Sequence, residues 1–307
     1  MAKLLVSLNA YMTGDPDKDR WYIGNVRLWG SPGWPICKNR PPRDTSRVVV
    51  VLNGDLERMR RGGMILAVEK GRQNGSFDDV LLVDNTGDTS DMAAHAEVLH
   101  REEEAGRLVD YQHFVFMNCS CRGPFVHRVR SPRWSWTDIL LDPIRSGEAG
   151  LVAPLIEVPP NVPDEEEKGA WRNVSPGQQV PFAHTLCFAA NKRAFDVFRE
   201  KGLLLNRSQG YKGGVVEERR ISEAVLGSGI PIASLLPNQQ GVDWLDAKNE
   251  WIADKWRPSP KSTDPEAAGP SPFFGEKIHP FEGIFVKTGR NRDDSTISRC
   301  TRAVVTW

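Results

Sequence analysis

The sequence predicts an α/β fold, with a mixed, mostly parallel β-sheet flanked by helices. Three observations indicate it. Short apolar runs recur between residues 1 and 120, an Asn or Asp closes each run, and helical patterns lie between them. Runs that are apolar throughout are typical of strands covered on both faces. Strands that alternate with helices indicate βαβ units and a parallel sheet.

Four runs form the first half of the predicted sheet. They are Lys3–Leu8, Val48–Leu52, Val80–Val83 and Phe114–Met117. The polar residues that follow them are Asn9, Asn53, Asp84 to Asp88, and Asn118 to Ser120. Because ligands of open α/β sheets bind at the carboxyl ends of the strands, we expect these side chains to line one crevice.

Two helical patterns connect these strands. Met92–Gly106 follows a capping Asp91 and ends at a glycine, as many helices do. Leu56–Val68 has a weaker pattern because it contains Gly62 and Gly63. The stretch Gly14–Arg43 is rich in Gly, Pro, Asp and Trp, so we expect irregular structure with one short helix.

The pattern continues less regularly after residue 125. Further strands are expected at Gly150–Val158, His184–Ala189, Pro231–Leu236 and Gly283–Lys287. Further helices are expected at Trp134–Leu141, Asn191–Lys201 and Glu217–Ser228. The acidic stretch Pro159–Gln179 and the Trp- and Pro-rich stretch Trp244–Pro272 are expected to be loops. No repeat or linker divides the chain, so we expect a single domain over residues 1–307.

Composition narrows the function classes. Forty Lys and Arg balance forty Asp and Glu, which removes the strongest argument for a nucleic-acid partner. Five unevenly spaced Cys imply no disulfide framework. No run approaches the ~18 apolar residues of a membrane span, so we expect no membrane span in this chain and a cytoplasmic protein by default.

Phosphate-binding signatures are missing from the sequence. It contains neither G-x-x-x-x-G-K-[S/T] nor G-x-G-x-x-G, which disfavours a P-loop kinase and a Rossmann dehydrogenase. A diphosphate would then be held by a metal ion, by Lys or Arg, or by backbone N–H groups.

Four blocks of the sequence, taken in order, resemble a family. They are DNTGDTSDMAAHAEVL (84–99), DYQHFVFMNCSCRGPF (110–125), VEERRISEAVLGSGIPIASLL (216–236) and IHPFEGIFVKTGR (278–290). They resemble GT-A-type glycosyltransferases of polysaccharide and glycan synthesis, and the match spans most of the chain. The resemblance implies a single GT-A-like, Rossmann-related domain.

The same resemblance implies a nucleotide-sugar donor, a glycan or polysaccharide acceptor and a divalent metal, Mn²⁺ or Mg²⁺. Residues 1–125 would form the nucleotide-sugar-binding half and residues 126–307 the acceptor half. If the chain is a trimmed catalytic fragment, the expected location is the Golgi lumen instead of the cytoplasm. The implied donor-binding residues are Asn9, Asn53, Asp84, Asn85, Gly87, Asp88, Asn118, Ser120, Arg122, His184 and Lys287.

Asn118-Cys119-Ser120 departs from the family pattern, which places a D-x-D metal clamp at this point. Mg²⁺ and Mn²⁺ prefer anionic oxygen ligands, whereas Asn and Ser offer neutral ones. A metal would be held by Asn118 and Ser120 with help from Asp88 or His279, or would not be used. His279 is alternatively a turn residue before Pro280.

Glu217 and Glu218 are the candidate catalytic residues. Either could be the general base that takes the acceptor proton in an inverting displacement. The competing interpretation is that both open a helix, where carboxylates complement the helix dipole. Arg122, Lys287 and Arg290 are likewise either diphosphate ligands or ordinary ion-paired and surface charges.

Two other classes of protein remain open. The first is a cysteine-dependent enzyme, with Cys119 or Cys121 as nucleophile or zinc ligand and His184 or His279 as base. The second is a non-catalytic nucleotide-sugar- or glycan-binding protein on the same fold.

Overall fold

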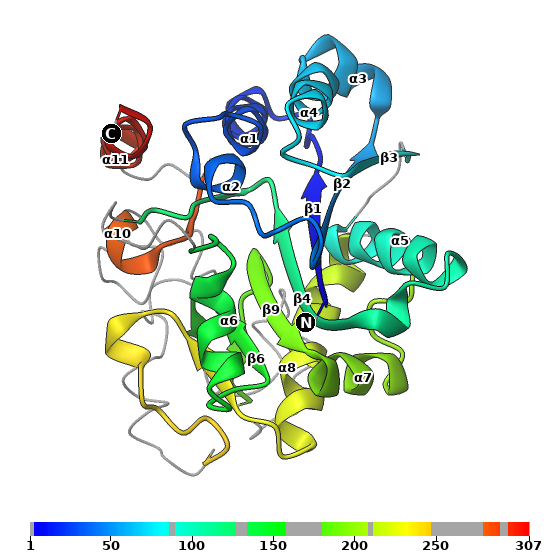
Figure 1. Cartoon of the computed structure of the whole chain (residues 1–307), viewed down its shortest axis with the longest axis vertical. Helices are drawn as coiled ribbons and strands as arrows, with labels where there is room; N and C mark the ends of the chain where they lie inside the picture. Colours follow the sequence, from blue (N-terminus) through cyan, green and yellow to red (C-terminus); the bar gives the residue numbers. More distant parts are fainter. Residues whose placement is uncertain are drawn as a thin grey trace, which may run out of the picture.

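A computed structural model of the chain describes residues 3–85, 90–126, 134–157, 180–207, 211–246, 279–288 and 294–306. Within these ranges a seven-stranded sheet has the order β10-β6-β9-β4-β1-β2-β3 (Figure 1). Its strands are β1 (Lys3–Ala10), β2 (Ser46–Gly54), β3 (Asp79–Asp84), β4 (Tyr111–Asn118), β6 (Leu151–Ala153), β9 (Cys187–Asn191) and β10 (Ile232–Ser234). Only β9 runs against the common direction in this sheet. The predicted α/β fold with a mixed, mostly parallel sheet is confirmed.

Helices cover both faces of the sheet. One face, here called the α1 face, packs against α1 (Pro16–Trp29), α2 (Pro35–Lys38), α3 (Leu56–Arg61), α4 (Met64–Gln73), α6 (Asp138–Arg145) and α11 (Asp294–Thr306). The other, the α5 face, packs against α5 (Asp91–Glu104), α7 (Lys192–Glu200) and α8 (Tyr211–Gly227). Successive side chains of a strand point to opposite faces, so Val6 and Leu8 enter the first core and Leu5 enters the second. This burial on both faces explains the continuous apolar runs.

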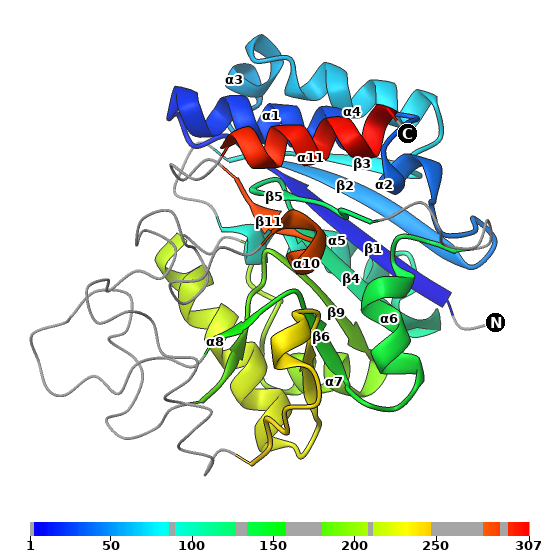
Figure 2. The ribbon, with the colours of Figure 1, turned by 90° about the vertical axis from the view of Figure 1, so that its left-hand side faces the viewer.

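Shorter elements complete the described part of the fold. β5 (Cys121–Arg122) pairs with β11 (Val286–Lys287), and β7 (Ile156–Glu157) pairs with β8 (Phe182–Ala183). The turns η1 (Leu108–Asp110) and η2 (Pro237–Gln239) and the short helix α10 (Pro280–Gly283) lie between larger elements. Figure 2 shows α11, the last helix, running beside α1.

The prediction for Gly14–Arg43 was wrong, because the 14-residue helix α1 lies there. Its start has a physical cause: the Asp15 side chain accepts hydrogen bonds from the first backbone N–H groups, and Pro16 occupies the first helical position. The predicted helix Leu56–Val68 is two helices, α3 and α4. They are separated at Gly62 and Gly63, and Gly63 adopts a φ of +79° that favours glycine.

The second half of the chain also departs from the prediction. The expected strand Gly150–Val158 is broken at Pro154 into β6 and β7. Helix α8 begins at Tyr211, six residues before the expected start, and α11 was not predicted. The expected strand Gly283–Lys287 is instead the end of α10 followed by β11, and the loops expected at Pro159–Gln179 and Trp244–Pro272 lie largely outside the described residues.

One buried histidine makes the core sensitive to pH. His95 of α5 is fully buried on the α5 face, its Nδ1 is 2.8 Å from Ser7 Oγ, and its ring packs edge-on against Phe116. Burial lowers the pKa of His95 to about 3. The native protein therefore keeps this ring neutral under conditions in which an unfolded chain would protonate it.

We expect the free energy of unfolding to decrease as the pH falls below about 6.5, because only the unfolded chain then binds a proton at His95. The contribution of this residue reaches at most about 1.4 kcal/mol per pH unit. Urea denaturation at pH 7.5, 6.5 and 5.5 measures it. The double variant Ser7→Ala/His95→Leu removes the histidine together with its partner, and a pH slope equal to that of the wild type would contradict the assignment.

Candidate functional site

The chain reverses its direction across the sheet between β1 and β4. It moves outward from β1 to β2 and β3, then returns to the other side of β1 as β4. In open α/β sheets such a switch point opens a crevice at the carboxyl ends of the two strands. Near this crevice lie Asn9, the penultimate residue of β1, and Asn118, the last residue of β4, which are register partners.

Three asparagines lie on the α5 face near this point. Asn53 is the penultimate residue of β2, on the other side of β1, and lies two residues beyond Val51, the register partner of Asn9. We call Asn9, Asn53 and Asn118 the asparagine cluster; all three are at least 96% buried. The polar residues that follow the apolar runs were expected to line one crevice, and these three lie on neighbouring strands of one face.

Asn118 connects the end of β4 with the start of α5. Its Nδ2 donates a hydrogen bond of 2.7 Å to Asp91 Oδ2. Its Oδ1 accepts hydrogen bonds from Ser120 N at 3.1 Å and from Ser120 Oγ at 2.5 Å. Both ends of the amide are therefore used, and Ser120 is held in the turn that follows the strand.

Asp91 has a role that the sequence analysis missed. We expected it to cap α5, but the cap is Ser90, whose Oγ accepts a hydrogen bond from Ala93 N at 3.1 Å. Asp91 instead receives the hydrogen bond from Asn118, and Asn53 Nδ2 donates to the carbonyl oxygen of Ser90 at 3.3 Å. Only the register of α5 against the sheet reveals this role.

Asn9 differs from the other two asparagines. Its side-chain Oδ1 and Nδ2 are buried and have no hydrogen-bond partner among the described residues. Burying an amide without partners costs about 1–3 kcal/mol, so such groups in native proteins require an explanation. A ligand whose donors and acceptors reach Asn9 at the switch point is one explanation.

Glu218 and His184 lie next to this cluster. Thr185 N donates a hydrogen bond of 2.7 Å to Glu218 Oε1, and His184 Nδ1 is 4.0 Å from the same oxygen. Leu186, which follows Thr185, accepts a hydrogen bond of 3.0 Å from Asn118 N through its backbone carbonyl oxygen. A carboxylate and an imidazole therefore stand beside the end of β4.

Glu217 points elsewhere. It is buried and accepts a hydrogen bond from the backbone N–H of Leu204, which adopts a positive φ of 55°. The expectation that the two glutamates open a helix was wrong, because α8 begins at Tyr211 and both lie in its second turn. Helix-dipole complementarity therefore explains neither of them.

The remaining predicted donor residues are not part of the cluster as described. Asp84 is exposed at the end of β3, the edge strand, and Val83 packs on the α5 face, so Asp84 points to the other face. Asn85 donates its backbone N–H to the Gly54 carbonyl at 3.0 Å. Gly87 and Asp88 lie outside the described residues.

The other predicted residues follow β4 in the sequence. Arg122 belongs to a separate pocket on the α1 face. The backbone of Lys287 pairs with Cys121, and its side chain, like Arg290, lies outside the description. His279 Nε2 is 3.7 Å from Cys300 Sγ, and Cys300 belongs to the α1-face core.

The residues proposed for a metal do not form a metal site by themselves. Asn118 Oδ1 already accepts two hydrogen bonds, one of them from the Ser120 hydroxyl. The exposed His279 ring stacks on Phe281, and its Nε2 lies 3.7 Å from Cys300 Sγ of the α1-face core. Within the described ranges no group of three His, Cys, Asp or Glu could hold an ion. The anionic oxygen nearest to Asn118 is that of Asp91.

Cys119 has the properties of a core residue. It is fully buried, and its Sγ is 3.3 Å from Tyr11 N and 3.4 Å from Tyr11 O. Burial raises the pKa of the Cys119 thiol, and it does the same for Cys187. A reactive cysteine needs a lowered pKa and access, so this environment disfavours the cysteine-dependent interpretation.

The chain matches no protein-family model, and comparison with curated proteins finds no relative. Among the residues described, no helix is both long and apolar enough to cross a membrane.

The close contact between α8 and α5 at the site can be tested with one methyl group. A Cβ at Gly214 would lie 2.5 Å from the Ser90 Cβ, so α8 can approach the start of α5 only with glycine there. We expect Gly214→Ala to lower the free energy of unfolding by about 1–3 kcal/mol in urea denaturation. Gly227→Ala, in the same helix but facing open space, is the matched control and should be neutral or stabilising. Equal stability of the two variants would argue against the contact.

Proposed function

We propose that the chain is a glycosyltransferase that transfers a sugar from a nucleotide-sugar donor to a hydroxyl group of a glycan, with inversion. The observation that supports it most directly is the buried Asn9 amide at the β1/β4 switch point, which has no hydrogen-bond partner within the described part of the chain. An amide offers two donors and one acceptor, which suits a nucleobase edge or a sugar hydroxyl. The four sequence blocks that resemble GT-A-type glycosyltransferases support the same function.

Glu218 is the better candidate for the general base. It is 21% exposed, lies beside the strand ends and faces His184, whereas Glu217 is buried against the backbone of Leu204. In the proposed reaction the acceptor oxygen forms a bond to the anomeric carbon as the bond to the diphosphate oxygen breaks. Glu218 takes the hydroxyl proton, and the nucleoside diphosphate leaves with the electron pair.

A divalent metal would neutralise the leaving diphosphate if it binds. The Ser120 hydroxyl donates to Asn118 Oδ1, so these two groups are engaged with each other. The carboxylates of Asp91 and Asp88 are the groups that would suit a metal. The rival function is a protein that binds a nucleotide sugar or glycan without transferring it. Release of free nucleoside diphosphate distinguishes the two functions.

The donor site is tested by thermal shift with UDP-, GDP-, dTDP- and CMP-sugars, with and without Mn²⁺. A ligand that binds only the native state raises the melting temperature, and we expect one nucleotide class to do so. Asn9→Ala should weaken the binding of that ligand about tenfold, because it removes the amide that would hydrogen-bond to the ligand. Ser7→Ala, two residues earlier on the same face, serves as the control and should leave binding unchanged. If no nucleotide sugar binds, or if Asn9→Ala binds like the wild type, the donor site is misplaced.

The base is tested with two neighbouring variants of equal chemistry. We expect Glu218→Gln to lower kcat by about 10²- to 10⁴-fold, because the amide cannot take a proton. Glu217→Gln should keep kcat near that of the wild type and act mainly on stability. Single-turnover release of nucleoside diphosphate is the measurement, and wild-type kcat in Glu218→Gln would show that the base lies elsewhere.

A further inference from the structure

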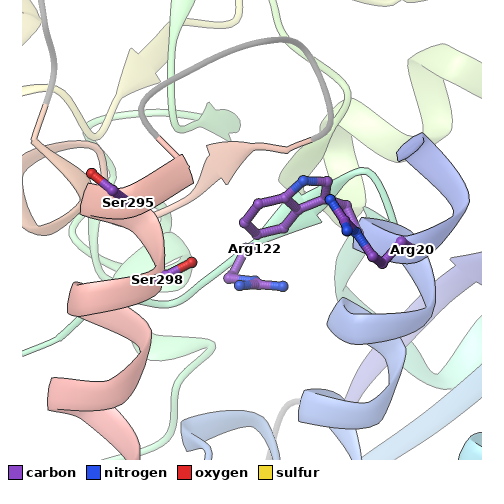
Figure 3. A pocket seen from close by; sticks show the side chains of 5 residues that line it. Arg20, Arg122, Ser295 and Ser298 are labelled. Atoms are coloured by element: carbon purple, nitrogen blue, oxygen red, sulfur yellow. The ribbon is translucent and has the colours of Figure 1, made fainter.

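A pocket separate from the asparagine cluster lies between α1 and α11. It has a volume of about 500 Å³ and is lined by Arg20, Trp21, Arg122, Ser295 and Ser298 (Figure 3). Helices α1 and α11 contribute residues to the core of the α1 face, whereas the asparagines lie on the α5 face. The size is that of a small-ligand site, since such pockets measure roughly 300–1,000 Å³.

Arg122 is held in one orientation in this pocket. Its Nε donates a hydrogen bond of 2.6 Å to Asn25 Oδ1, and its Cζ lies 4.6 Å from the centre of the Trp21 ring. Its Nη1 donates to Thr301 Oγ1 of α11 at 3.3 Å, and the side chain is 92% buried. Contacts from two helices therefore fix a guanidinium group before any ligand arrives, which reduces the entropy lost on binding.

A second guanidinium group enters the same pocket. Arg20 precedes Trp21 on α1, is exposed, and forms no salt bridge within the described part of the chain. Two like charges that line one small space repel each other, and an anion between them converts this repulsion into attraction. Figure 3 shows the Ser298 side chain pointing toward Arg122, so a hydroxyl group also faces this space.

The pocket is connected to the proposed transfer site through the backbone. Asn25, which holds Arg122, donates from Nδ2 to the carbonyl oxygen of Cys119 at 2.8 Å. Cys119 is the residue between Asn118 and Ser120. A ligand bound to Arg122 would therefore lie next to the turn that follows β4. It would lie on the α1 face, opposite the asparagine cluster.

We propose that this pocket binds the anionic group of an acidic saccharide acceptor, a sulfate or carboxylate carried on a sugar ring. The planar guanidinium group of an arginine matches two oxygens of such a group with two parallel hydrogen bonds. The pocket is larger than a single oxyanion requires. The indole edge of Trp21 and the serine hydroxyls would suit the sugar ring that carries the anionic group. That the saccharide is an acceptor rests on the proposed transfer function. That the pocket binds an acidic saccharide does not depend on it.

The test is isothermal titration calorimetry of the whole chain with four probes: a sulfated disaccharide, a uronate-bearing disaccharide, a neutral disaccharide and inorganic sulfate. We expect the acidic disaccharides to bind and the neutral one to bind at least about tenfold more weakly. Arg20→Gln should weaken the acidic probes by about tenfold. Arg27→Gln makes the same charge change about two turns further along the same helix, at an exposed residue that does not line the pocket, and should leave them unchanged.

Three outcomes would overturn the proposal: equal binding of the neutral disaccharide, equal affinities of Arg20→Gln and the wild type, or binding of inorganic sulfate alone. A steady-state assay separates this result from the transfer function. Arg20→Gln should raise KM for an acidic acceptor relative to a neutral one and leave kcat unchanged. If acidic saccharides bind but no sugar is transferred, the pocket stands and the transfer function fails.

Discussion

The architecture of the site depends on the side chain of Asn118. Its amide donates to Asp91 at the start of α5 and accepts from Ser120 in the following turn, so strand, turn and helix share one residue. An aspartate at this position would have no hydrogen to donate and would place a second carboxylate against Asp91, where two negative charges repel. The neutral residue that departs from the D-x-D pattern of the resembled family is therefore explained by its neighbour in the fold.

The other end of α5 is fixed by charge. Buried Glu102 accepts hydrogen bonds from Arg47 at 2.9 Å, from Arg107 at 2.7 and 2.8 Å, and from the Tyr111 hydroxyl at 2.7 Å. Burial alone would raise the pKa of Glu102, but these hydrogen bonds and charges outweigh it and lower the pKa. Because Arg47 and Tyr111 begin β2 and β4, α5 is fastened to the sheet near both of its ends. The asparagine cluster thus lies beneath a helix whose position is well determined.

Sequence patterns predicted the parts of the fold that depend on local chemistry. The apolar runs of β1 to β4 and the start of α7 at Asn191 follow from burial and capping, so the sheet and the converging asparagines could be anticipated. The start of α1 was predictable as well, since Asp15-Pro16 is typical of a helix start. The Gly-, Pro-, Asp- and Trp-rich composition of the surrounding stretch indicated irregular structure instead. The role of Asp91, the different directions of Glu217 and Glu218, and the pocket around Arg122 depend on helix register and on contacts between distant segments. No local pattern contains that information.

Residues 118 to 122 illustrate how two sites can share one short stretch. Asn118 belongs to the asparagine cluster and accepts a hydrogen bond from Ser120, whereas Cys119 and Cys121 point into the core of the α1 face. The carbonyl oxygen of Ser120 accepts hydrogen bonds from Thr288 N at 2.8 Å and Thr288 Oγ1 at 3.1 Å, which holds β11 beside the turn. Arg122 then enters the pocket between α1 and α11. Hydrogen bonds of Asn118 with Asp91, and of Asn25 and Thr288 with the carbonyl oxygens of Cys119 and Ser120, therefore fix one stretch of backbone that contributes to both the asparagine cluster and the pocket.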